Sequence, residues 1–377
     1  MKMMNQKASN IEVRKMNKSL IFDYIYRNGQ LSKQDIAYAL NMSLPTVTQN
    51  LKELFSRGLI LEDGQFESTG GRKAKAISYN SNACFAVGLD ITRNHIGIVL
   101  INLGGQVIRN ARIRRQFENS EDYFRRLGDL IHQFVEEAKI DGRKICGVGI
   151  AVPGILSDDN QTVVYSPVLG FTGGTCESFS RYIPYPCILY NDANAAGFAE
   201  LWNSENIHNV VYLSLSDSVG GSILIDNNLY FGENQRSGEF GHMIIVPEGK
   251  QCYCGQKGCV DAYCSARILS ESSHGNISEF FSLLRAGSEP QTEIWKEYLY
   301  HLALTINNLR MLFDCNVILG GYVGSYIDEY IDVIRDMVAK RNTFEVDGSY
   351  LKPCSYKLES IAVGAALMHI KKFIDNI

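Results

Sequence analysis

The sequence has 377 residues, of which 45% are hydrophobic and 21% charged, a composition typical of soluble globular proteins with two or three domains. Its first residues are polar and no apolar run reaches the ~18 residues of a membrane span, so we expect neither a secretion signal nor a membrane segment. A cytoplasmic location, with reduced thiols among the ten cysteines, is then the expectation. The net charge of −4 is uneven, because residues 1–79 carry +5 and the remainder −9. This basic head is expected to meet a polyanion.

The basic head predicts three short helices. The first helix is expected at 16–27. Its core-facing side is expected to carry Leu20, Ile21, Tyr24 and Ile25. Ser32 caps a second helix, 33–40. Ser43 caps a third helix, and Pro45 in its first turn loses no hydrogen bond. Three helices at this spacing are typical of a helix-turn-helix module.

The third helix and the basic hairpin after it are the predicted DNA-binding surface. Its apolar positions recur at intervals of 4 and 3 residues, which turns Val47, Leu51 and Leu54 inward and leaves polar groups outside to contact bases and phosphates. Strands at 59–61 and 76–77 flank residues 68–75, where two glycines precede three cations suited to a narrow minor groove. The candidate DNA contacts are Ser43, Thr46, Thr48, Gln49, Lys52, Arg72 and Lys73. The alternative for this head is a trihelical protein-interaction module.

The body begins with an apolar strand at 84–90 and a hairpin of strands, 96–101 and 107–113. An amphipathic helix, 127–138, precedes buried strands at 145–152 and 187–190. The last of these strands delivers Asn191-Asp192 to the start of a helix, 193–202, and 210–215 is a further strand. Helices are expected between 266 and 310, a strand from 317, and a closing helix at 360–374. The sequence shows no internal repeat.

The stretch from Glu239 to Asp261 contains a predicted metal site. It holds His242, Cys252, Cys254 and Cys259, three thiols and an imidazole, which is a donor set that closes a structural Zn²⁺ tetrahedron. Gly255 and Gly258 lie between the last two cysteines, where a chain that folds around a metal needs residues without a Cβ. The alternative is a loop of reduced thiols.

The same stretch carries a family resemblance. Glu-Phe-Gly-His followed by Cys-x-Cys-Gly-x-x-Gly-Cys-x-Asp resembles the signature of the ROK family of repressors, open reading frames and sugar kinases. The resemblance extends to the Gly-Gly-Arg of the wing and covers nearly the whole chain. It implies an α/β protein in which an N-terminal winged helix-turn-helix, 1–79, precedes a two-lobed actin-like ATPase fold of the sugar-kinase kind. We expect the first lobe at 80–190, joined by the C-terminal helix 358–377, and the second lobe at 191–357.

By this resemblance, the sugar site comprises Asn191, Asp192, Glu239, His242 and Asp261. In the family's kinases the Asn-Asp pair grips the sugar and the Asp is the general base, so Asp192 is a vestigial base; its alternative role is a helix cap alone. The zinc loop is implied to buttress the sugar pocket, with His242 shared between metal and sugar. Asp261 stands where the family usually has the longer Glu, which leaves the contact made there open.

Both phosphate loops that the resemblance leads us to expect are altered. The first reads Asp90-Ile91-Thr92-Arg93-Asn94 in place of Asp-x-Gly-Gly-Thr, and the second places Asp217 in what should be a glycine-rich run. Glycines let backbone N–H groups approach phosphate oxygens, and a carboxylate repels a triphosphate. Gly320-Gly321 survives, but a strand-to-helix turn needs glycines for backbone reasons as well.

These features predict a sugar-responsive transcriptional regulator, most simply a repressor, that binds double-stranded operator DNA as a homodimer or tetramer. It keeps a monosaccharide effector pocket with a structural zinc and does not transfer phosphate. A first alternative is a bifunctional ATP-dependent sugar kinase with a DNA-binding head. A second is a regulator for which zinc itself is the signal.

Overall fold

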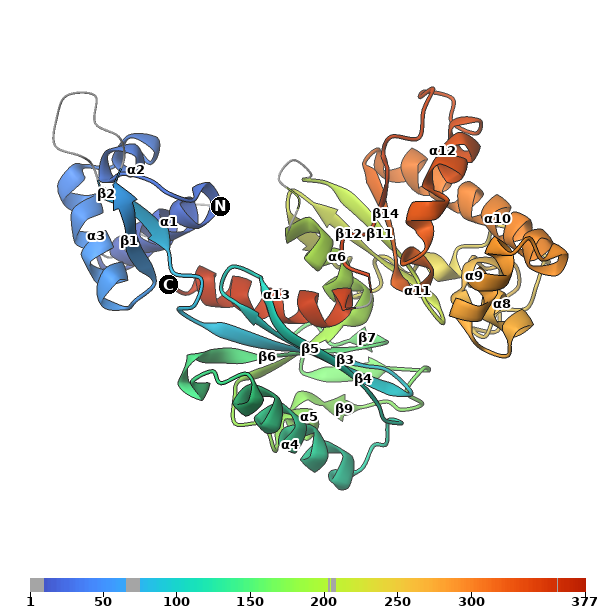
Figure 1. Ribbon diagram of the computed structural model, residues 1–377, viewed down its shortest axis with the longest axis horizontal. Coiled ribbons are helices and arrows are strands. Elements are labelled where there is room, and N and C mark those ends of the chain that lie inside the picture. Colours follow the sequence, from blue (N-terminus) through green and yellow to red (C-terminus); the bar gives the residue numbers. More distant parts are fainter. Residues whose placement is uncertain (1–9, 66–74, 203, 205–207, 358) are drawn as a thin grey trace, which may run out of the picture.

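The computed structural model describes residues 10–65, 75–202, 204, 208–357 and 359–377, and the chain forms a small head beside a two-lobed body (Figure 1). The head contains three helices and a hairpin: α1 (Asn10–Asn28), α2 (Lys33–Ala39), α3 (Leu44–Ser56), β1 (Ile60–Gln65) and β2 (Lys75–Tyr79). Both predicted helix caps are confirmed. Ser32 Oγ accepts from the Asp35 amide at 3.2 Å, and Ser43 Oγ accepts from the Thr46 amide at 3.3 Å.

The core of the head follows the predicted inward face of α3, since Val47, Leu51 and Leu54 are buried. The prediction for the first helix is partly wrong. Leu20 is 46% exposed, and Phe22 is buried in its place beside Ile21 and Ile25. The inward face of α1 is therefore centred about one residue further around the helix than its apolar spacing suggested.

The wing is an antiparallel hairpin in which Ile60 pairs with Tyr79 and Glu62 with Ile77. Lys75 Nζ lies 2.6 Å from Glu62 Oε2, so this cation is paired within the hairpin. The tip, 66–74, with the predicted DNA contacts Arg72 and Lys73, lies outside the described residues.

The first lobe is built on a five-stranded sheet with the order β10-β6-β3-β4-β5. Its strands are β3 (Phe85–Ile91), β4 (His95–Asn102), β5 (Val107–Arg114), β6 (Ile145–Val152) and β10 (Cys187–Asn191). Helices α4 (Glu121–Glu137) and α5 (Cys176–Ser180) cover its outer face (Figure 1). A small sheet joins β7 (Ile155–Leu156), β8 (Thr162–Tyr165) and β9 (Gly174–Thr175).

The second lobe has its own five-stranded sheet, with the order β13-β12-β11-β14-β15. Its strands are β11 (Val210–Leu215), β12 (Val219–Ile225), β13 (Asn228–Tyr230), β14 (Asn316–Gly320) and β15 (Leu351–Pro353). Its helices are α7 (Asp261–Cys264), α8 (Ala266–Ser270), α9 (Ile277–Arg285), α10 (Glu289–Phe313), α11 (Gly321–Gly324) and α12 (Ile331–Ala339).

The two lobes repeat one strand plan. In each sheet three consecutive strands form an antiparallel meander, and two later strands add in parallel on the other side of the first. The hairpins β3–β4 and β11–β12 are thus equivalent elements of the two lobes. The sequence shows no repeat because the plan fixes only strand order and burial, which many sequences satisfy.

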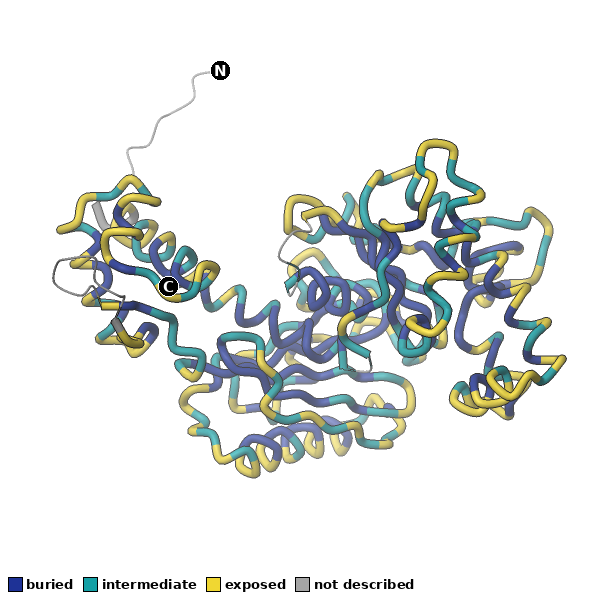
Figure 2. Tube along the Cα trace, turned by 45° about the horizontal axis from the view of Figure 1, so that its top comes forward, coloured by how far each residue is buried: buried dark blue, intermediate teal, exposed yellow. Residues whose placement is uncertain are grey.

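Two helices, α6 (Asp192–Trp202) and α13 (Ser360–Asp375), lie side by side between the sheets, and most of their residues are buried (Figures 1 and 2). Glycines permit the close packing of α13. A Cβ on Gly149 would lie 2.1 Å from the Ala365 carbonyl oxygen, and one on Gly364 would lie 1.7 Å from the Ala195 carbonyl oxygen. The α13 backbone therefore touches both β6 and α6.

The head and the body share one continuous apolar core. Ile374 and Ile377, at the end of α13, are buried in the same cluster as Ile21 and Phe22 of the head. Arg57 Nη1, directly after α3, donates to the Ile377 carbonyl oxygen at 3.0 Å. None of the helices in the described ranges combines the length and apolar character that a bilayer span requires.

Candidate functional site

A cleft between the two lobes encloses a cavity of about 1150 Å³, where the hairpins β3–β4 and β11–β12 approach the start of α6. Four of the five predicted sugar residues line this cavity: Asn191, Asp192, Glu239 and His242. They come from two stretches of chain almost 50 residues apart in sequence, and the fold brings them together. We call the part of the cleft lined by these four residues the sugar half.

Asn191 and Asp192 lie where β10 ends and α6 begins. Asn191 Oδ1 accepts from the Asn194 amide at 2.9 Å, and its Nδ2 donates to the Gly154 carbonyl at 3.0 Å. Asp192 Oδ1 accepts from the Ala193 amide at 2.8 Å. These bonds fix both side chains at the N-terminus of α6. Asp192 can therefore cap the helix and line the cleft at the same time.

Asp192 is partly buried at the cleft and lies near two other carboxyls, Asp90 and Glu239. Loss of hydration raises its pKa to about 6; the Ala193 amide opposes the rise and Glu239 adds to it. Asp90, at the end of β3, has its pKa raised to about 7 by burial and then by Asp192, with Arg112 opposing. Carboxyls with raised pKa values in a cleft are typical of ligand sites.

Glu239 precedes the tight turn Phe240–His242, and His242 is its last residue. His242 Nε2 lies 3.3 Å from the Tyr253 hydroxyl and 4.0 Å from Glu239 Oε2. The other ring nitrogen, Nδ1, lies 4.0 Å from Cys252 Sγ. His242 therefore presents one nitrogen to the cysteine cluster and the other toward the cleft.

The four predicted metal ligands are brought together. The ligand atoms of His242, Cys252, Cys254 and Cys259 all lie within 4.8 Å of one another, and Cys254 Sγ lies 3.8 Å from Cys259 Sγ. A tetrahedral site with metal–sulfur bonds of about 2.3 Å has sulfur–sulfur edges of about 3.8 Å. The donor set and its spacing therefore fit a four-coordinate metal ion.

The predicted glycine requirement of this loop is confirmed. Gly255 and Gly258 have φ values of +90° and +80°, which other residues rarely adopt. A Cβ on Gly258 would also lie 1.8 Å from the Val246 carbonyl oxygen. These two positions let the chain double back so that Cys259 reaches the other ligands.

Asp261 lies beneath the cleft and is absent from the described residues that line it. Its side chain is fully buried, and its Oδ1 accepts from the Val219 amide at 2.7 Å. Arg267 Nη2 lies 3.6 Å from Oδ2. The short side chain thus ties the metal loop to the β11–β12 hairpin.

The loops Ile91–His95 and Leu215–Val219 line the other part of the same cavity, which we call the nucleotide half, and the first of these loops is held by internal bonds. The Thr92 amide donates to the His95 carbonyl at 3.0 Å, and Thr92 Oγ1 accepts from the His95 amide at 3.0 Å. The carbonyls of Arg93 and Asn94 accept from Phe117 and Arg115. This turn has no glycine that would let phosphate oxygens approach its amides.

Three polar side chains also occupy this half or bridge it. Arg112 of β5 crosses to the second lobe, where its Nη2 donates to the Tyr322 hydroxyl at 3.0 Å and its guanidinium lies 5.2 Å above the Tyr322 ring. Asp217 lines the cleft, where partial loss of hydration raises its pKa and Arg112, Arg267 and His95 oppose the rise. Gly321 (φ +76°) donates its amide to the Tyr212 hydroxyl at 3.2 Å, so the surviving glycine pair serves the backbone.

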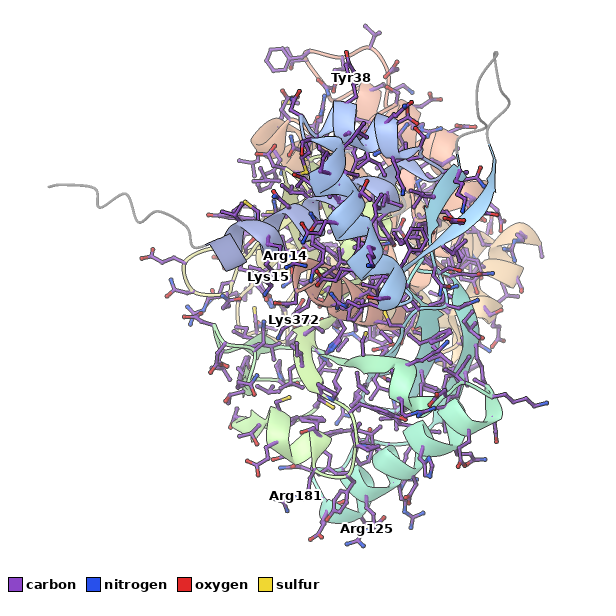
Figure 3. All side chains as sticks on the ribbon, turned by 90° about the vertical axis from the view of Figure 1, so that its left-hand side faces the viewer. Arg14, Lys15, Tyr38, Arg125, Arg181 and Lys372 are labelled. Atoms are coloured by element: carbon purple, nitrogen blue, oxygen red, sulfur yellow. The ribbon has the colours of Figure 1, made fainter. Side chains whose placement is uncertain are left out.

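The predicted base-reading face of the head is accessible. Thr48, Gln49 and Lys52 are exposed on α3, whereas Ser43 and Thr46 bond each other through their hydroxyls at 2.8 Å. Viewed end-on, the head carries Tyr38 at its outer tip and Arg14 and Lys15 on α1 (Figure 3). Tyr38 is 88% exposed, and no sequence pattern singled it out because an aromatic residue on a helix usually faces the core.

Sequence reasoning also missed Arg112, Tyr322 and Tyr253. Arg112 and Tyr322 are 210 residues apart, so only the fold pairs them. Tyr253 had a local signal, because it stands between two predicted metal ligands and was bound to lie near His242.

Comparison with known proteins agrees with this geometry. The pattern of the ROK family matches residues 86–372, which is most of the chain. The chain belongs to the ROK family. Its head separately matches the winged helix-turn-helix DNA-binding pattern over residues 17–60. The predicted family and fold class are thus confirmed.

ROK family members with and without a head resemble this chain to different extents. The xylose repressor of Bacillus spizizenii is 28% identical over 376 residues, covering 96% of this chain and 97% of that protein. The crystal structure of a ROK family transcriptional regulator, a homologue of the Escherichia coli MLC protein, superposes with a TM-score of 0.77 at 21% identity and covers 97% of both chains. A ROK glucokinase from Streptomyces griseus, solved with glucose and AMPPNP, reaches 0.62 at 23% identity and covers 75% of this chain but 98% of its own. The kinase structure corresponds to the body alone.

Proposed function

We propose that this ROK family protein is a sugar-responsive, DNA-binding transcriptional repressor. The observation that carries the proposal is the presence, in one chain, of a winged helix and a kinase-like cleft in which one half gathers four sugar-type side chains while the other has a glycine-free turn and the Arg112–Tyr322 bond. The full-length match to a protein named xylose repressor supports the same conclusion.

The proposed effector is a neutral monosaccharide held by Asn191, Asp192, Glu239 and His242. Carboxylates and an amide suit vicinal hydroxyls, because each group accepts or donates in pairs. Asp261 acts from beneath, through its bond to the Val219 amide. A phosphorylated ligand is disfavoured here, because the carboxylates of Asp192 and Glu239 both line the cavity and would repel its phosphate group.

Zinc is the proposed metal of the four-residue cluster. Three thiolates and one imidazole favour Zn²⁺ in a closed, structural site, where the metal supplies folding energy rather than chemistry. His242 is the metal ligand that connects the cluster to the sugar half, because its other ring nitrogen lies near Tyr253 and Glu239. By holding one nitrogen of His242, the metal therefore fixes the orientation of this side chain in the sugar half.

The head is proposed to contact operator DNA through Thr48, Gln49 and Lys52 of α3, with Ser43 and Thr46 shaping the start of that helix. The wing residues Arg72 and Lys73 remain proposed phosphate or minor-groove contacts. One head covers only a half-site, so we expect a two-fold dimer on an inverted repeat. Each phosphate contact removed, as in Lys52→Ala, should flatten the slope of log affinity against log salt by about 0.9.

Sugar binding is proposed to draw the lobes together and thereby move the heads. A sugar that favours the closed form about 100-fold supplies about 2.7 kcal/mol per site, enough to weaken operator binding when two sites act in one dimer. Linkage requires the reverse as well, that operator DNA weakens sugar binding by the same factor.

The deciding experiment has two measurements on the full chain. Thermal shift and calorimetry with D-xylose, D-glucose and N-acetyl-D-glucosamine identify a ligand, and binding to a duplex selected from random DNA is then measured with and without it. We expect one neutral sugar to bind and to lower operator affinity. Equal operator affinity in both conditions would refute sugar-responsive repression.

A bifunctional sugar kinase is the second candidate, because Asp192 and the kinase fold are retained. Preorganised phosphate and Mg²⁺ contacts supply most of the catalysis in phosphoryl transfer, so a retained base is not sufficient. Sugar-dependent ADP release that Asp192→Asn abolishes would favour this candidate.

A further inference from the structure

The helix α6 runs from the sugar half of the cleft to the DNA-binding head. Its first residue is Asp192 and its last is Trp202, so its eleven residues span about 15 Å. Figure 1 shows α6 lying along α13 between the lobes. One element thus joins a sugar-facing carboxyl at one end to an indole at the other.

The indole of Trp202 packs on the head. Its ring meets the Tyr26 ring of α1 edge-on at 6.0 Å between centroids, and Phe198 supports it at 5.6 Å from one turn earlier in α6. The Tyr26 hydroxyl donates to the Leu103 carbonyl at 3.0 Å, and its ring lies 4.8 Å from that of Tyr79 at the base of the wing. Tyr26 therefore touches the body and the wing hairpin at once.

Close packing makes α6 a rigid body. A Cβ on Gly197 would lie 2.0 Å from Ser222 Oγ, and the Ala195 carbonyl touches Gly364 of α13. All residues from Ala195 to Leu201 are buried. Packed interiors shift as units and do not bend locally, so a displacement at Asp192 must reappear at Trp202.

The head is held to the body at a second point, where Arg57 donates to the Ile377 carbonyl at the end of α13. That helix packs directly on the first-lobe sheet, because a Cβ on Gly88 or Gly149 would collide with its backbone. A head fixed at α13 and pushed at Tyr26 would rotate rather than translate.

We propose that Trp202 and Tyr26 are the positioning residues that transmit sugar binding from the cleft to the DNA-binding head. The inference rests on the proposed sugar-responsive function and adds the route of the response. Neither residue contacts the sugar half or the base-reading face of α3, so each ligand should bind on its own when the contact is altered.

The test measures a coupling factor, the operator affinity without sugar divided by that with saturating sugar, in full-length protein with D-xylose, D-glucose and N-acetyl-D-glucosamine as probes. Factors of about 5–150 are typical of allosteric pairs. We expect Trp202→Ala to bring the factor close to 1 while sugar affinity and sugar-free operator affinity each stay within threefold of wild type. Trp202→Phe should restore part of the coupling, because it keeps an aromatic edge for Tyr26 but lacks the indole N–H that bonds the Tyr26 hydroxyl.

Tyr26→Phe is the milder variant, because it keeps the ring and removes only the hydroxyl, with its hydrogen bonds to Leu103 and Trp202. It should lower the factor by less than Trp202→Ala does. The matched control is Tyr182→Phe, which removes a tyrosine hydroxyl bond to Glu121 on the outer face of the first lobe and should leave the factor unchanged.

A spectroscopic readout separates transmission from stability. The chain has two tryptophans, so Trp295→Phe leaves Trp202 as the sole indole. Its emission should change with sugar at a midpoint equal to the calorimetric dissociation constant. An unchanged coupling factor in Trp202→Ala, or sugar affinity lost along with coupling, would overturn the inference while the wild-type response stands. A wild-type protein without any sugar response would overturn the proposed function and this inference together.

Discussion

The sugar half and the nucleotide half of the cleft belong to one cavity but are built in different ways. In the sugar half, side chains supply the ligand contacts, and Asp192, Glu239 and His242 are anchored by neighbours yet line the cavity. In the nucleotide half, backbone amides would have to supply the contacts, and the Thr92 amide is instead bonded to His95. A site made of backbone amides cannot bind phosphate where residues other than glycine block the approach, whereas a site made of side chains does not depend on glycines in its loops.

The largest effect is expected from removing the metal cluster that supports the sugar half. Cys254→Ser should abolish metal binding and reduce sugar affinity beyond detection, because metal binding and local folding are coupled. Metal content and calorimetric sugar titration measure the two effects. Cys315→Ser, a half-buried thiol outside the cluster, is the control and should change neither. Normal sugar affinity in metal-free protein would contradict the linkage.

A matched pair of substitutions then compares the halves directly. Asp192→Ala should weaken sugar binding about 10- to 150-fold, the range for hydrogen bonds to a charged group of about 1.5–3 kcal/mol. Asp217→Ala, in the nucleotide half, should change it less than threefold. Calorimetry on both variants decides the matter, and equal losses would show that the halves do not act separately.

The raised pKa of Asp192 gives a third test. Its carboxylate form accepts bonds from sugar hydroxyls, so affinity should be full above about pH 7 and fall as the pH drops through about 6, approaching tenfold per unit. Asp90 and Glu239 face this group and Arg112 acts on Asp90, so Asp192→Asn is needed to isolate it. A residual slope as steep in that variant would assign the titration to another group.

The last prediction is that adding a nucleotide has no effect on sugar binding. Millimolar MgATP should leave sugar affinity unchanged and release no ADP above background, because the nucleotide half is lined by the Asp217 carboxylate and by a glycine-free turn whose Thr92 amide is already bonded. Coupled-enzyme detection of ADP and a sugar titration with ATP present measure this. Tighter sugar binding with ATP would show that the nucleotide half still works.

Local patterns were enough for much of the fold. The strands at 145–152 and 210–215 have the predicted bounds, and Ser32 and Ser43 cap the predicted helices. The metal residues were predictable because their types and spacing are local. Leu20 was misplaced because apolar spacing on a helix gives the width of its inward face but not its centre, which packing against α3 decides.

The sequence by itself determined the winged helix, the metal cluster and the altered phosphate loops, since each is written in residues close together along the chain. Only the tertiary structure decided that Asp261 supports the Val219 amide instead of lining the cleft, and that Arg112 reaches Tyr322 across it. The same holds for the repeated strand plan of the lobes and for the contact between Trp202 and Tyr26. The physical reason is common to all four: each depends on where separate segments pack, and side-chain direction across such distances is set by the whole core rather than by local spacing.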